Sequence, residues 1–253
     1  ILTEVYEPIF MDMSYGFRPN RSCHDALRAL NHVITTQKVS YIVDADIKGF
    51  FDNVDHDWIM RMLEHRISDP NLLRLIKRFL IAGIMEQGRW EDSDTGTPQG
   101  GLISPILANI YLHYTLDIWF EKIVKKQLRG EAHLVRYADD FVCCFQYRDD
   151  AEKFYAELKE RLAKFKLEVA AEKSKIIEFG RFAEPTLSKR GLRPDTFDFL
   201  GFTHYCGKSR NGRFRVKRVT SKKKLKAKLK GIKLWMKCAS VDNLSFGCFF
   251  TTS

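Results

Sequence analysis

The sequence lacks the features that would place the chain in a membrane or outside the cell. It has no secretory signal, no transmembrane run and no internal repeat. Its six cysteines show no metal-ligand spacing, which suits reduced, buried thiols. These absences exclude a secreted disulfide scaffold, a membrane-spanning protein and a repeat protein. We expect a soluble, cytoplasmic chain with no membrane partner.

The composition predicts a globular protein with an anionic partner. With 253 residues, 45% of them hydrophobic, the chain can bury a core as one large or two modest domains. Lys and Arg number 42 against 32 acidic residues, and the excess is concentrated in the basic amphipathic segment 221–235. Phosphate backbones attract such a helix. The alternative is a membrane-surface or calmodulin-target helix.

Two acidic segments follow residues that favour strands. Asp139 and Asp140 lie in a tight turn, and a second acidic segment with Asp46 follows Tyr41-Ile42-Val43. Neighbouring carboxylates repel each other unless water or a cation compensates their charge. If the two strands pair, Asp46 and Asp139 can bind a common Mg²⁺, as nucleotidyl transfer requires. Alone, a Tyr-x-Asp-Asp turn is more often only a solvated turn.

Five blocks in a fixed order strengthen the catalytic interpretation. They cover residues 14–27, 46–56, 96–105, 137–140 and 197–202, and they include Ser14-Tyr15-Gly16-Phe17-Arg18-Pro19, Gly96-Thr97-Pro98-Gln99-Gly100 and Phe197-Asp198-Phe199-Leu200-Gly201-Phe202. With these blocks, the chain resembles the reverse transcriptases encoded by bacterial and organellar group II introns.

The resemblance implies a metal site and a residue at the leaving group. Asp46, Asp139 and Asp140 match the Mg²⁺ ligands of the polymerase palm, and the carbonyl of Ile47 is an extra ligand. Asp140 is the less direct ligand, and its alternative role is to shape the turn. Lys173 matches a lysine near the leaving pyrophosphate, where a cation neutralises charge. Its alternative is an ordinary surface lysine.

The resemblance also implies a nucleotide site. Phe51 stands at the position of the steric gate that rejects a ribose 2′-hydroxyl; its alternative is a core phenylalanine beside Phe50. Gln99 and Gly100 match a glycine-rich loop that contacts the incoming dNTP, since glycine allows backbone to approach a ligand closely. Taken alone, that loop reads as a turn.

The nucleic-acid contacts are expected in two places. Arg18 and Arg21 are suited to phosphate or template contact; alternatively they flank the helix that begins near Ser22, where Asp25 completes a capping box. Leu200 and Gly201 match the block that holds the primer end. After the hairpin turn at Asn211-Gly212, Lys217 and Arg218 could follow phosphates, or the strand is a solvated edge guarded by lysines.

We therefore expect an α+β fold, a right-hand polymerase palm with an antiparallel sheet backed by helices, partial fingers and an incomplete thumb. Residues 1–205 would form fingers and palm, without upstream fingers elements, and 206–253 the primer-grip hairpin and a truncated thumb. Helices are predicted near 22–36, 55–65, 69–82, 104–127, 149–166 and 221–237, and strands near 40–46, 133–137, 140–146, 174–180, 197–203 and 213–218.

Three functions compete at this point. The first is an RNA-directed DNA polymerase that extends a DNA or RNA primer with dNTPs and Mg²⁺ on an intron RNA template. The second is a maturase-type protein that binds intron RNA, or an inactive fragment. The third, an RNA-directed RNA polymerase, conflicts with Phe51, since ribonucleotides need a smaller gate. The sequence does not predict an oligomeric state.

Overall fold

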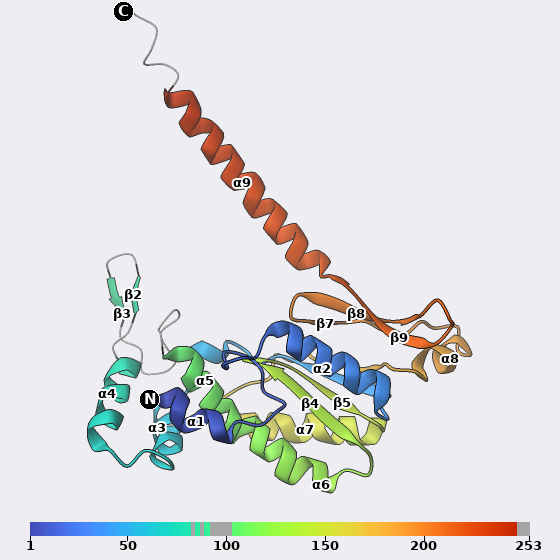
Figure 1. Ribbon diagram of the computed structural model, residues 1–253, viewed down its shortest axis with the longest axis horizontal. Coiled ribbons are helices and arrows are strands. Elements are labelled where there is room, and N and C mark those ends of the chain that lie inside the picture. The colour runs from blue at the N-terminus through green and yellow to red at the C-terminus, as the bar shows by residue number, and fades with distance from the viewer. Residues whose placement is uncertain (82–83, 87–88, 92–102, 247–253) are drawn as a thin grey trace, which may run out of the picture.

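The computed structural model describes residues 1–81, 84–86, 89–91 and 103–246, with side chains at all of these positions except 84–86, 89–91, 184, 223–224 and 237–246. Its centre is a sheet flanked on both faces by other elements (Figure 1). In the described part of the chain this sheet has four antiparallel strands in the order β4-β5-β1-β6. The strands are β1 (Tyr41–Ala45), β4 (Ala132–Tyr137), β5 (Asp140–Phe145) and β6 (Lys175–Glu178).

Alternation along the strands divides the core between the two faces of this sheet. Val43, Ala45 and Cys143 belong to one buried cluster, and Ile42 and Cys144 to the other. The adjacent cysteines therefore point to opposite faces and are both fully buried. Burial raises the pKa of the Cys144 thiol to about 12, so it is protonated at neutral pH.

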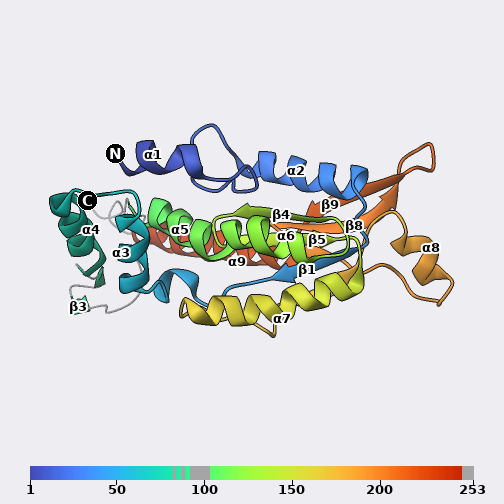
Figure 2. The same cartoon turned by 90° about the horizontal axis from the view of Figure 1, so that it is seen from below.

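Helices cover the face of the sheet to which Val43 and Cys143 point. A continuous helical segment runs from residue 104 to residue 127 and includes two π-helical turns, and it lies with α7 against the sheet (Figure 2). Smaller helices extend this layer toward the N-terminus. The elements are α1 (Leu2–Tyr6), η1 (Glu7–Ile9), η2 (Phe50–Asp52), α3 (His56–Glu64), α4 (Pro70–Ile81), α5 (Ser104–Leu112), η3 (His113–Asp117), η4 (Phe120–Val124), α6 (Lys125–Gln127) and α7 (Arg148–Lys164).

A helix and a second sheet cover the other face (Figure 1). Helix α2 begins at a capping box in which the side chains of Ser22 and Asp25 each accept a backbone N–H of the other. In the described residues the second sheet has three strands, β7-β8-β9. The elements are α2 (Cys23–Thr36), α8 (Ala183–Ser188), β7 (Phe197–Phe199), β8 (Phe202–Lys208) and β9 (Phe214–Thr220).

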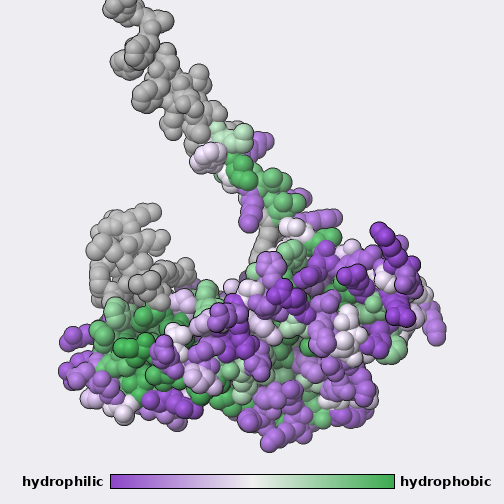
Figure 3. Space-filling model, in the orientation of Figure 1, coloured by the Kyte–Doolittle hydropathy of each residue, from purple (hydrophilic) through white to green (hydrophobic). Residues whose placement is uncertain are grey.

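Helix α9 (Lys222–Phe246) extends away from the body, and a short hairpin of β2 (Ile84–Glu86) and β3 (Arg89–Glu91) stands beside α4. Figure 3 shows hydrophilic residues concentrated over β7–β9 and α8, and a hydrophobic area at the opposite end of the molecule. Among the described residues, we find no helix with the length and apolar character needed to span a bilayer.

Most predicted elements are confirmed, including the α+β class, but two are wrong in extent. The strand predicted at 197–203 reverses direction at Leu200 and Gly201, because both take a positive φ (+50° and +84°) and close a two-residue hairpin. The helix predicted at 221–237 continues to Phe246. Helix α8, most of strand β8 and the β2–β3 hairpin were not predicted. The predicted boundary between the two domains, after residue 205, lies within strand β8. The division of the chain into these domains stays a prediction.

Candidate active site

The two acidic segments meet where β1 pairs with β5. Ala45 lies opposite Phe141, so the next residue on each strand, Asp46 and Asp140, continues the same register. Asp139 belongs to the two-residue loop of the β4–β5 hairpin, in which Tyr137 pairs with Asp140. Ala138 takes a φ of +56° at the first loop position, as in a type II′ turn. The strand pairing predicted from the sequence is confirmed.

The turn concentrates negative charge. Burial raises the pKa of Asp139, the negative charge of Asp46 raises it further, and the guanidinium of Arg136 opposes this. Burial also raises the pKa of Asp44, to about 7, and nearby carboxylates that include Asp140 add to the shift. A cation bound between these carboxylates would relieve the repulsion.

The oxygen atoms at this turn fit a hard divalent cation. No group of three or more His, Cys, Asp or Glu arranged for a metal occurs in the described part of the chain, but Mg²⁺ is commonly held by one or two carboxylates together with substrate phosphates. Ile47 pairs with Val169 at a non-hydrogen-bonded position, since the bonds run from Lys48 N–H to Glu168 and from Ala170 N–H to Asp46. The carbonyl of Ile47 therefore points away from Val169.

Lys173 lies beside Asp46. Its Nζ donates a hydrogen bond of 3.1 Å to Asp46 Oδ2, and both side chains are partly exposed. The backbone holds the two residues together, because Ala170 N–H bonds to Asp46 O and Ser174 Oγ accepts the Asp46 N–H. An exposed pair of this kind contributes little stability and can be exchanged for other partners. The lysine thus lies at the acidic turn, and its role at pyrophosphate stays a prediction.

Asp140 connects the turn to the second sheet. Its Oδ2 accepts the backbone N–H of Leu200 at 3.2 Å, so the tip of the β7–β8 hairpin is bonded to the β4–β5 turn. Gly201 is held in turn by the bond from Ser221 N–H to its carbonyl. This hydrogen bond favours the alternative role of Asp140, in which its side chain shapes the turn and is the less direct metal ligand.

A buried arginine behind the turn was missed by the sequence interpretation. The Arg136 side chain is fully buried and forms a bidentate pair with Asp117, at 2.8 Å from Nε and 2.6 Å from NH2. Its other bonds reach Asn109 Oδ1, Ala138 O and Ser14 Oγ. The sequence did contain a sign of this buried arginine, since Arg136 is a charged residue inside the otherwise apolar run Leu134-Val135-Arg136-Tyr137.

Gly16 packs directly on the backbone of the turn. A Cβ at this position would lie 2.3 Å from Ala138 N and 2.9 Å from Tyr137 C. The Gly16 carbonyl also accepts a buried hydrogen bond of 2.6 Å from Asn109 Nδ2. The requirement for glycine in this block is therefore a close approach of two backbone segments.

The remaining predicted residues have varied surroundings. Phe51 is partly buried and packs edge-to-face on the buried Phe50 at 5.3 Å, so the two phenylalanines differ in exposure. The Arg18 guanidinium is buried, bonded to Glu7 and to backbone carbonyls, and Arg21 bonds to Asp12. Both arginines thus stabilise the segment between η1 and α2 (residues 10–22), which we call the first loop. Gln99 and Gly100 lie outside the described residues.

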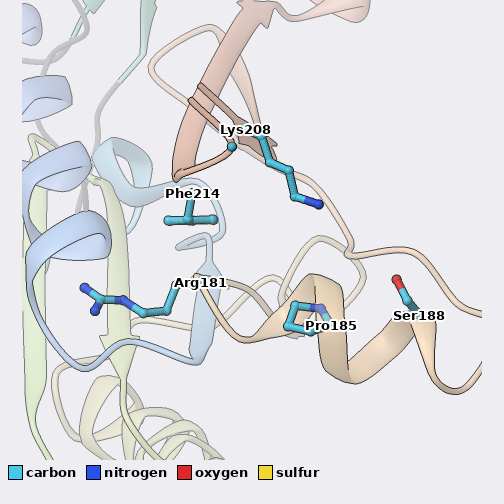
Figure 4. Close-up of a pocket in the computed structure, with 6 residues that line it drawn as sticks. Arg181, Pro185, Ser188, Lys208 and Phe214 are labelled. Carbon is cyan, nitrogen blue, oxygen red and sulfur yellow. The ribbon is translucent and has the colours of Figure 1, made fainter. Parts of the chain in front are cut away.

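The basic residues of β9 point in two directions. Lys217 and Arg218 are both exposed, but adjacent strand residues face opposite sides, and the stem of Lys217 lies across Gly207. A cavity of about 290 Å³ lies at the far end of the β8–β9 hairpin, lined by Arg181, Pro185, Ser188, Lys208, Gly212 and Phe214 (Figure 4). The Arg181 guanidinium turns away from it and donates to Thr35 O.

The chain is similar in sequence to known proteins. The family model "Reverse transcriptase (RNA-dependent DNA polymerase)" matches residues 1–204. The group II intron-encoded protein LtrA of Lactococcus lactis subsp. cremoris is 46% identical over 113 residues, which are 45% of this chain and 18% of LtrA. Protein YkfC of Escherichia coli is 30% identical over 242 residues, covering 84% of this chain and 60% of YkfC.

The fold is also similar to that of solved telomerase structures. The apo telomerase from Candida tropicalis truncated from its C-terminal domain superposes with a TM-score of 0.58 at 17% identity, covering 82% of this chain and 41% of the telomerase chain. A likeness at this identity concerns the fold alone. The chain spans less than two thirds of each of these relatives.

Proposed function

Because the chain belongs to the reverse transcriptase (RNA-dependent DNA polymerase) family, we propose that it carries the active site of a group II intron-type RNA-directed DNA polymerase. Such an enzyme adds dNTPs to a primer on an RNA template. The β4–β5 turn with Asp139 would be its catalytic turn. One observation supports this most directly: β1 pairs with β5 so that the segment with Asp46 reaches the β4–β5 turn, where the charge of Asp46 helps to raise the pKa of Asp139. Two residues that are 93 positions apart in the sequence would thereby form one acidic site.

The protein would hold Mg²⁺ through Asp46, Asp139 and the carbonyl of Ile47. A bound divalent cation stabilises the charge on the attacking and leaving oxygens of a phosphoryl transfer. Lys173, bonded to Asp46 in the free chain, would exchange that partner for the departing pyrophosphate. Phe51, partly buried in the short helix η2 that follows β1, would exclude the 2′-hydroxyl. Gln99 and Gly100 would contact the dNTP.

The β7–β8 hairpin would position the primer. Leu200 and Gly201 form its tip, and Asp140 bonds that tip to the catalytic turn. Lys217 and Arg218 would contact the phosphates of the primer or of an intron RNA template. The buried side chain of Arg18, bonded to Glu7, has an internal role and is not included among the proposed nucleic-acid contacts. Arg21 is partly exposed, and its partner Asp12 is exposed, so Arg21 would exchange Asp12 for a phosphate of the nucleic acid.

A maturase-type function is the second candidate, in which the chain binds intron RNA without polymerising. It is favoured by the exposed basic residues of β9 and by the lysine-rich helix α9, which extends from the body. The similarity to LtrA, a group II intron-encoded protein, also favours it. These surfaces need no carboxylates to bind RNA.

Replacing Asp139 with Asn separates the two candidates. Removing one metal-binding charge should abolish Mg²⁺-dependent extension of a DNA primer on an RNA template, while RNA binding in a filter assay is retained. A matched variant, Asp149→Asn, changes an exposed aspartate at the start of α7 and should extend normally.

The outcomes are distinct. Extension by the unmodified chain that is lost in Asp139→Asn supports the polymerase. RNA binding by an unmodified chain that never extends a primer supports the maturase-type function. Undiminished extension by Asp139→Asn would refute the proposed active site.

A further inference from the structure

We propose that Arg136 and Asp117 are positioning residues for the catalytic turn: the buried pair fixes the peptide that joins Ala138 to Asp139 and so sets the direction of the Asp139 carboxylate. The inference rests on the proposed function, because it assigns the pair a role in metal binding by Asp139. It follows from the contacts of one fully buried side chain.

The decisive contact is between Arg136 and the turn itself. NH1 of Arg136 donates to the Ala138 carbonyl at 2.9 Å. That carbonyl belongs to the peptide plane whose nitrogen is the backbone N of Asp139, so fixing it restricts rotation just before the metal-binding side chain. Ala138 needs this support, because a non-glycine residue at positive φ is strained.

The geometry uses every donor that an arginine has. The guanidinium carries five N–H groups in a planar fork, and the structure provides five acceptors: both oxygens of Asp117, Asn109 Oδ1, Ala138 O and Ser14 Oγ. A lysine has three donors and no fork. The site is therefore built for arginine.

The acceptors come from different elements. Ser14 belongs to the first loop, Asn109 to α5 and Asp117 to the π-helical turn η3. The backbone of Arg136 adds to the same junction, since its N–H bonds to Met13 O and its carbonyl accepts the Tyr15 N–H. The catalytic turn is thereby held against both the loop and the long helical segment.

Asp117 is placed by an irregularity of that helical segment. It is the last residue of the π-helical turn His113–Asp117, and such turns occur often at functional sites. The neighbouring His113 is buried, with Nδ1 at 3.9 Å from Asp117 Oδ2, and burial lowers its pKa. A neutral His113 leaves the Arg136 guanidinium as the cation that pairs with Asp117.

The test compares two buried aspartates at opposite ends of the β4–β5 hairpin. Asp117→Asn weakens the pair behind the turn. Asp150→Asn is the matched control, since Asp150 is also buried but accepts the N–H groups of Arg129 and Gly130, before β4. For each variant we would measure Mn²⁺ binding to the free chain by electron paramagnetic resonance, and kcat and dNTP KM of primer extension.

We expect Asp117→Asn to weaken Mn²⁺ binding by about 10- to 100-fold, the usual effect of removing support from a metal ligand. The value of kcat should fall while the dNTP KM stays near that of the unmodified chain, and Asp150→Asn should bind Mn²⁺ normally even if its melting temperature falls equally. Unchanged Mn²⁺ binding in folded Asp117→Asn, or an equal loss in Asp150→Asn, would overturn the inference.

Two milder variants keep the test decisive if Asp117→Asn does not fold. Ser14→Ala removes one acceptor of Arg136 and leaves the ion pair, and Arg136→Lys keeps the charge but not the fork. Both should weaken Mn²⁺ binding, and normal binding by both would refute the inference. An unmodified chain that binds Mn²⁺ but extends no primer would contradict the proposed function alone, because the metal titrations still test the positioning.

Discussion

At the scale of single residues, Asp44 is the unexpected feature of the acidic site. It lies in β1 opposite Val142 on one side and Lys175 on the other. Burial is the main reason that its pKa rises to about 7, and the Lys175 ammonium only partly opposes the shift. The folded chain therefore binds a proton at Asp44 more tightly than the unfolded chain does.

The sign of the resulting pH effect can be measured. Because the folded-state pKa is raised from 3.8 to about 7, the contribution of Asp44 to stability is fully present below pH 4 and is lost as the pH rises toward 7. Asp44→Asn removes this loss. Its free energy of unfolding, relative to the unmodified chain, should increase by about 2 kcal/mol between pH 5 and pH 8.

Urea unfolding at both pH values in the presence of EDTA would check this prediction, since EDTA keeps divalent cations from the neighbouring carboxylates. Asp149→Asn, at the exposed start of α7, supplies the baseline. A difference between Asp44→Asn and the unmodified chain that shrinks as the pH rises would contradict the prediction.

At the scale of elements, the β4–β5 turn is held in place by two other segments that pack on it or bond to it. The first loop approaches so closely that Gly16 has no room for a Cβ beside Ala138 and Tyr137. The β7–β8 hairpin bonds to Asp140 from the other sheet. The turn's geometry is thus a property of three elements, of which only the hairpin that carries the turn contains a proposed metal ligand.

Gly16→Ala should displace the turn. Because the colliding atoms are backbone atoms, the added methyl group can be accommodated only if one segment shifts, and a misplacement of about 1 Å can reduce a rate by roughly 100-fold. We expect kcat of primer extension to fall by about this factor while RNA binding is retained.

Gly191→Ala is the control for this change. Gly191 has a positive φ, +72°, and no atom lies within 4 Å of its Cβ position, so alanine there strains the backbone without touching the turn. A normal kcat in Gly16→Ala, or an equal fall in Gly191→Ala, would show that the close approach does not position the turn.

At the scale of the whole molecule, the charge is unevenly distributed. The net charge is +10, and exposed basic residues follow β9 on the face of the central sheet opposite α7 (Figures 1 and 3). Binding to a phosphate backbone releases counterions, so the affinity depends steeply on salt.

Lys217→Gln should therefore weaken RNA binding similarly for unrelated sequences and reduce the slope of log K against log[salt] by about 0.7–0.9, the value for one phosphate contact. Fluorescence anisotropy over a salt series measures both quantities. Lys153→Gln on α7 removes an exposed lysine paired with Glu157 and should leave the slope unchanged. Equal slopes for Lys217→Gln and the unmodified chain would exclude a phosphate contact at Lys217.

Local patterns were sufficient for most elements. Short runs of residues that favour strands identified β1, β4 and β5, and the Ser22-Asp25 capping box marked the start of α2. Asn211-Gly212 marked the turn before β9, where Gly212 has a φ of +72°. The reversal at Leu200 was missed because leucine rarely adopts a positive φ, and only the tertiary bond to Asp140 reveals why it does so here.

The sequence by itself determined the acidic segments, the strands that carry them and the family to which they belong, because these depend on residue type and on spacings of a few residues. Only the tertiary structure decided that Arg136 is buried against Asp117, that Gly16 touches Ala138, and that Lys173 reaches Asp46. These contacts join residues far apart in the chain, and they depend on how whole elements pack, which no local period encodes.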